Sequence, residues 1–166
     1  MITRSNKNME AYLRKLNDES GSSTYELPEE TLSTIKSGFL QKDNTILLAA
    51  VNRDKQLPKF GNDQERMDYE YTNNKFSTDT PEEDEETNYL KRTLECAYQL
   101  ADLLKTEFPG KKFKILAFFN ETQFESEDHM AMFAGSSLRF YEVKEEDGDN
   151  DLEGYEGEAV LELLVS

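Results

Sequence analysis

The chain has 166 residues, 33% of them charged, and a formal net charge of −16. This length favours one compact domain, and the 10 Phe and 8 Tyr residues supply a core that excludes disorder throughout. The single cysteine excludes an internal disulfide and a cysteine-based zinc site. No apolar run approaches the roughly 20 residues that span a bilayer, and no signal peptide is recognisable at the start, so we expect a soluble cytoplasmic protein.

The first half of the chain predicts two short helices and a buried strand. An apolar stripe indicates an amphipathic helix over residues 6–18. A second helix starts at Pro28, because proline is tolerated in the first turn and the acids that follow it complement the helix dipole. Residues 45–51 form a continuous apolar run, typical of a strand buried on both faces. Apolar and acidic side chains alternate over residues 67–71, which favours an edge strand.

One long helix is predicted over residues 81–108. Thr80 and Glu83 have the spacing of a capping box, and Pro81 suits the first helical position. Pro109 and Gly110 end the helix. Apolar residues recur behind the cap at spacings of three and four, and they form the expected buried stripe: Leu90, Leu94, Ala97, Ala101, Leu104 and Phe108.

Three strands are predicted in the second half of the chain, over residues 112–119, 138–143 and 159–165. The strand at 45–51, the long helix and the strand at 112–119 suggest a crossover unit with parallel strands. The last two strands suggest an antiparallel hairpin. The sequence therefore predicts a single α+β domain, with a mixed sheet of four or five strands covered by the long helix 81–108, and short N-terminal helices.

The charge is concentrated in one half of the chain. Residues 1–78 carry 12 acids against 11 bases, whereas residues 79–166 carry 23 acids against 8 bases. Such a field repels nucleic acid and anionic lipid and attracts basic surfaces. We therefore expect neither a nucleic-acid nor a membrane partner, but a basic protein.

Two acidic clusters carry most of this excess. The first, at 79–86, exceeds what helix capping needs, so it is either a solvated helix start or a contact surface for a basic partner. The second lies in the loop 145–158, which contains Tyr155 as a candidate anchor. The predicted partner-binding residues are Glu82, Glu83, Asp84, Glu85, Glu86, Glu145, Glu146, Asp147, Asp149, Asp151 and Tyr155.

The second cluster does not match a helix-loop-helix calcium site. Starting at Asp147 places Leu152 where glycine is required, and starting at Asp149 places Val160 where the closing acid is required. We therefore expect a solvated loop that binds cations weakly, and we predict no metal site and no cofactor.

No motif for catalysis is recognisable. The only histidine, His129, would need partners brought to it by the fold, and Cys96 lies near the apolar stripe as a small buried hydrophobe would. Several aromatic residues outside the strong elements are interpreted either as interface anchors or as satellite core: Tyr25, Tyr69, Tyr71, Phe76, Phe124 and Tyr155.

These observations favour a non-enzymatic binding protein whose acidic face docks on a basic protein and blocks it. An immunity protein or antitoxin that neutralises a toxin acting on nucleic acid, or an inhibitor that imitates the charge of nucleic acid, would fit this pattern. The alternative is a small hydrolytic enzyme, carboxylate-based and metal-assisted, that uses Asp147, Asp149 and Asp151 together with His129. An enzyme should gather acids around a concave pocket, whereas a docking protein should spread them over an exposed face.

Overall fold

The computed structural model describes residues 1–19, 25–78, 86–120, 135–144, 152–155 and 157–166. Helices and strands alternate irregularly along the chain, as expected for an α+β protein. In chain order the elements are β1 (Ile2–Ser5), α1 (Lys7–Glu19), α2 (Glu29–Ile35), β2 (Phe39–Lys42), β3 (Thr45–Leu48), α3 (Ala49–Asn52), α4 (Asp63–Asn73), β4 (Phe76–Ser77), α5 (Glu86–Glu107), β5 (Phe113–Asn120), β6 (Gly135–Glu142), the single 3₁₀ turn η1 (Leu152–Gly154) and β7 (Ala159–Val165).

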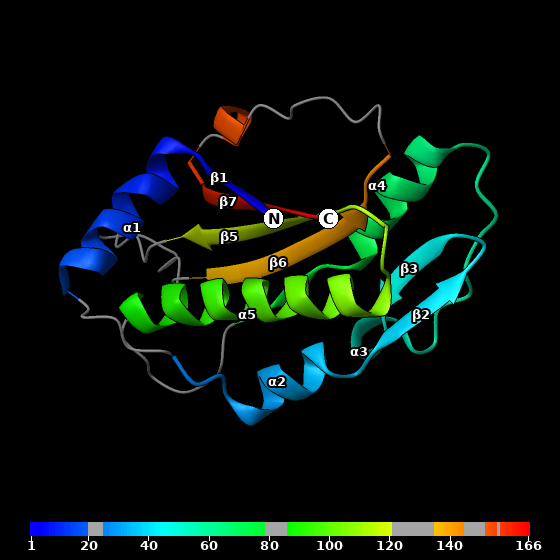
Figure 1. The fold of residues 1–166 in the computed structure, drawn as a ribbon, viewed down its shortest axis with the longest axis horizontal. Coiled ribbons are helices and arrows are strands. Elements are labelled where there is room, and N and C mark those ends of the chain that lie inside the picture. The colour runs from blue at the N-terminus through cyan, green and yellow to red at the C-terminus, as the bar shows by residue number, and fades with distance from the viewer. Residues whose placement is uncertain (20–24, 79–85, 121–134, 145–151, 156) are drawn as a thin grey trace, which may run out of the picture.

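The main sheet has five strands in the order β1-β7-β5-β6-β4, and every pair is antiparallel. Strand β5 lies at its centre, where Ala117 is opposite Leu138 of β6 on one side and Leu161 of β7 on the other. Ile2 of β1 is opposite Leu164 of β7, so the two ends of the chain lie side by side (Figure 1).

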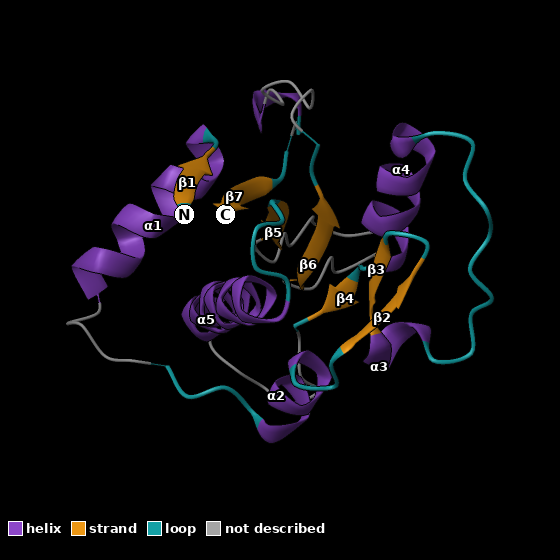
Figure 2. Cartoon of the chain, turned by 45° about the vertical axis from the view of Figure 1, so that its right-hand side comes forward, coloured by secondary structure: helices purple, strands orange, loops and turns teal. Residues whose placement is uncertain are grey.

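Helix α5 covers one face of this sheet and contacts β5, β6 and β7 (Figure 2). Its 22 residues make it about 33 Å long at 1.5 Å per residue. The interface between α5 and the sheet is the main core, and its members on the helix are Leu90, Cys96, Ala97, Leu100, Ala101 and Leu104.

Helix α1 follows directly from β1 because Asn6 serves both elements. The buried Asn6 Oδ1 accepts from the backbone N–H of Met9 at 3.0 Å, which caps the helix, and from that of Val160 at 3.1 Å, which holds the turn to β7. On the helix itself, the Tyr12 ring meets the edge of Phe119 with centroids 5.0 Å apart. One asparagine thus fixes the angle at which α1 leaves the sheet.

Strands β2 and β3 form a separate two-stranded sheet. Asp43 and Asn44 make its turn with φ of 49° and 67°, the left-handed conformation that two-residue hairpin turns require. Phe39 packs at the edge of Phe140 and of Phe108, with centroid distances of 5.9 and 5.3 Å, so the hairpin is anchored to the main core.

The structure confirms the α+β class, the five-stranded sheet, the long helix on the sheet and the short N-terminal helices. Residues 81–85, the expected first turns of the long helix, lie outside the described residues. Most of the predicted stripe is buried, but Leu94 and Phe108 are only partly buried at its edge.

Three expectations about the strands were wrong. Residues 45–48 pair with β2 and not with β5, so the parallel crossover is not formed and residues 49–52 turn into α3 instead. The last two long strands, β6 and β7, do not form a hairpin, because β5 lies between them. Residues 67–71 belong to helix α4, whose first turn Asn62 caps by accepting from the Glu65 N–H at 2.8 Å.

Candidate functional site

The acid excess lies outside the described framework. Of the 35 acids, 15 belong to residues 79–85, 121–134, 145–151 and 156, and none of the 19 bases does. The framework therefore carries 20 acids against 19 bases, a net charge of −1. A nearly neutral fold holds segments that contain acids and no lysine or arginine.

Two of these segments begin and end at the same end of the main sheet. Residues 79–85 follow Thr78, whose N–H donates to the Ser136 carbonyl at 3.1 Å, and they lead into α5. Residues 121–134 connect Asn120 to Gly135, which lie opposite each other. The described residues that flank 79–85 and 121–134 therefore lie at the same end of the sheet.

Residues 145–151 start elsewhere. They follow the end of β6, where Glu142 is opposite Phe113 at the far end of the sheet. They end at η1, whose Leu152 packs on Phe118 and Val160. This segment thus links the two ends of the sheet.

Most of the predicted partner-binding residues fall in these segments. Glu86 is the first residue of α5, and its side chain is not among those described. Outside the described residues lie Glu82, Glu83, Asp84, Glu85, Glu145, Glu146, Asp147, Asp149 and Asp151, as does His129 of the enzymatic alternative.

Tyr155 is the one predicted binding residue whose side chain the structure describes, and it packs inward. Its ring meets Phe118 edge-on with centroids 5.4 Å apart, and the side chain is partly buried. Burial, with a hydrogen bond to Tyr71, raises the pKa of the Tyr155 hydroxyl to about 12. Tyr155 therefore keeps its proton at neutral pH. Of the other aromatic residues discussed above, Tyr25, Tyr69, Tyr71 and Phe76 are also partly or fully buried.

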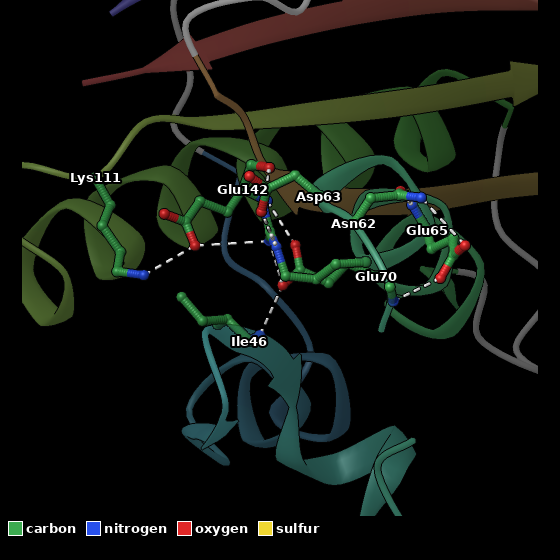
Figure 3. A network of polar contacts seen from close by, with 9 residues as sticks. Ile46, Asn62, Asp63, Glu65, Glu70, Lys111 and Glu142 are labelled. Atoms are coloured by element: carbon green, nitrogen blue, oxygen red, sulfur yellow. Dashed lines mark hydrogen bonds and ion pairs between the residues drawn. The ribbon is translucent and has the colours of Figure 1, made fainter. Parts of the chain in front are cut away.

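The most buried ionic cluster lies between α4, β3 and β6 and was not predicted. Glu70, fully buried, accepts from the Ile46 N–H and the Glu142 N–H, each at 2.8 Å, and from Arg66 at 2.9 Å (Figure 3). Lys111 donates to the Glu142 carboxylate at 2.8 Å. Burial raises the pKa of Glu70, and the two backbone hydrogen bonds and Arg66 oppose that shift.

Asn74, directly after α4, completes this arrangement. Its Oδ1 accepts from the Leu48 N–H at 2.8 Å, and its Nδ2 donates to the carbonyls of Ile46 at 2.9 Å and Phe140 at 3.2 Å. Together with Glu70, it gives hydrogen-bond partners to the facing edges of β3 and β6. The side chains of Glu70 in α4 and of Asn74, which caps its end, therefore take the place of a strand between the two sheets.

This cluster is a structural joint. Each carboxylate oxygen of Glu70 is engaged by a backbone N–H, and Arg66 is 3% exposed and paired. A nearby hollow of about 500 Å³ lies between the β2–β3 turn and the start of α4, and its lining includes Arg66 and the Asp63 carboxylate, which pairs with Arg66 at 3.3 Å, but not Glu70. Glu70 therefore does not meet the requirement of the enzymatic alternative, whose acids must line a concave pocket.

Cys96 and the acidic side chains are the remaining groups with potential for chemistry in the described part of the chain. Cys96 is fully buried, and its burial, with the nearby Glu95, raises the pKa of the thiol to about 12, so it is not a nucleophile at neutral pH. In the described ranges, no three His, Cys, Asp or Glu side chains gather closely enough to hold a metal ion.

Comparison of the chain with known proteins identifies no relative. No protein-family model matches the chain, and neither a curated protein nor a solved structure matches it. Among the described helices, none has the length and apolar character to cross a membrane.

Proposed function

We propose that this protein is an acidic, cytoplasmic binding protein that docks on a basic protein and inhibits it, as an immunity protein, an antitoxin or a mimic of nucleic-acid charge would. The single observation that supports this most is the separation of charge: a framework with a net charge of −1 holds segments with 15 acids and no base. Stability does not require this pattern, since like charges in one segment repel each other.

The positions of the flanking residues favour one contact surface at the end of the sheet where β5 ends and β6 begins. The flanks of 79–85 and 121–134 adjoin there, at Thr78, Asn120 and Gly135. Acids attached at one end of a rigid sheet produce a directional field, which steers a basic partner toward that end before close contact forms. Association would then be fast and sensitive to salt.

The test compares two variants with the same change in net charge. The first neutralises the acidic cluster through Glu82→Gln, Glu83→Gln, Glu85→Gln and Glu86→Gln. The control neutralises four exposed acids of the framework through Asp54→Asn, Asp68→Asn, Asp102→Asn and Glu107→Gln. Affinity purification from the native host should retain a basic protein with the wild type and the control but much less of it with the first variant. Equal retention by both variants, or retention of no basic protein, would contradict the proposal.

A further inference from the structure

Three buried hydroxyl groups join helix α5 to the end of the sheet where β6 begins. Thr78 Oγ1 lies 2.9 Å from Thr93 Oγ1 and 2.7 Å from Ser136 Oγ, and all three residues are buried. Thr78 directly precedes residues 79–85, and Ser136 is the second residue after 121–134. One chain of hydroxyl groups therefore connects the flanks of two acidic segments with the helix.

The direction of this chain follows from its end on α5. Thr93 Oγ1 donates to the Tyr89 carbonyl at 2.8 Å, one turn earlier in the helix. Because a hydroxyl has a single proton to donate, Thr93 accepts from Thr78, and Thr78 in turn accepts from Ser136. Without the Thr93 hydroxyl, the Thr78 hydroxyl therefore loses its acceptor on the helix.

Thr78 is also held through its backbone. Its N–H donates to the Ser136 carbonyl at 3.1 Å, and its carbonyl accepts from Arg92 Nη1 at 3.4 Å. Arg92 is itself 2% exposed, so this contact lies in the interior. Every polar group of Thr78 is thus engaged, and two neighbouring residues of α5, Arg92 and Thr93, fix the point where the first acidic segment leaves the framework.

We propose that Thr93 is a positioning residue of the docking surface: its hydroxyl fixes the flanks of 79–85 and 121–134 relative to each other and thereby sets how fast a basic partner associates. This inference rests on the proposed docking function. Steering depends on where charges are placed, and a chain that starts at a fixed residue carries its charges no further than about 3.5 Å per residue. Removing the hydroxyl leaves every charge of the sequence unchanged, so its effect is separable from that of the acids.

The experiment removes the hydroxyl with Thr93→Val and restores it with Thr93→Ser. Thr106→Val is the matched control, because Thr106 makes the same bond on the same helix, to the Asp102 carbonyl, but is exposed. Hydrogen exchange at the Thr78 amide of the native protein should be about two- to tenfold faster in Thr93→Val alone, as expected for one lost hydrogen bond. Stopped-flow association with the captured basic protein should also be slower, by about twofold or more, in Thr93→Val alone.

Three results would overturn the proposal, and they differ in what they say about docking. If exchange at the Thr78 amide is equal in Thr93→Val and Thr106→Val, the hydroxyl chain does not hold this flank. Ser136→Ala breaks the chain at its other end and gives the same test if Thr93→Val does not fold.

If exchange is faster but association is unchanged, while neutralising the acidic cluster at 79–86 slows association, the positioning role is wrong and the docking proposal stands. If neutralising that cluster leaves association unchanged as well, the docking proposal fails together with this inference.

Discussion

Replacing Asn74 with alanine should show whether the side chains of Glu70 and Asn74 take the place of a strand between β3 and β6. The substitution leaves the Leu48 N–H and the carbonyls of Ile46 and Phe140 without these partners in a buried position. Each buried group that loses its hydrogen bond costs about 1–3 kcal/mol. For three groups that share one side chain, and are therefore not additive, we expect a loss of about 3–6 kcal/mol.

Urea denaturation followed by circular dichroism measures this loss as a lower midpoint at an unchanged slope. Asn73→Ala is the matched control, because among the described residues the Asn73 side chain bonds only to the Tyr69 carbonyl and to the exposed Lys55. It should cost less than about 1 kcal/mol. Equal losses in the two variants would refute the idea that Asn74 joins the two sheets.

Three further predictions concern the core, pH and the thiol. Leu104→Ala, at a fully buried position, should destabilise the protein by about 2–5 kcal/mol in the same assay, and Leu94→Ala, at a partly buried one, by clearly less; equal costs would contradict the packing of α5. Because burial raises the pKa of Glu70 above 4.5, the folded state holds this proton to higher pH than the unfolded chain, so the free energy of unfolding should fall as pH rises through that raised value. In Glu70→Gln this fall should be absent. If the free energy of unfolding changes with pH in the same way in the wild type and in the variant, the pKa of Glu70 is not raised. Cys96 should react with a thiol reagent only after unfolding, and rapid labelling of the native protein at neutral pH would disprove its burial.

Local patterns in the sequence predicted the positions of helices and strands better than they predicted which strands pair with each other. The helix that became α5 and the strand that became β5 are both marked by periodic or continuous apolar residues, so their positions were predictable. Residues 45–48 were correctly expected to form a buried strand, but a run of apolar residues does not specify its neighbour. The left-handed turn at Asp43 and Asn44 selected β2 instead.

Helix α4 shows how a pattern can indicate the wrong structure. Tyr69 and Tyr71 alternate with acids as in a strand, but Asn62 and Glu65 have the spacing of an N-terminal helix cap, a signal that could have identified the helix. The ionic joint was beyond prediction, because Glu70 acquires its partners from β3 and β6, 24 and 72 residues away. Among so many acids, only the fold distinguishes a buried carboxylate from a solvated one.

The rate of association with the captured basic partner tests the docking proposal most directly. Stopped-flow measurements at low and physiological ionic strength should show fast association for the wild type and for the control with Asp54, Asp68, Asp102 and Glu107 neutralised. Association should be markedly slower with Glu82, Glu83, Glu85 and Glu86 neutralised, while dissociation changes less, because exposed charges act mainly on the encounter. Salt should slow the wild type toward the rate of that variant. An unchanged association rate in that variant, with the acids of 145–151 neutralised as well, would show that the charge serves solubility alone.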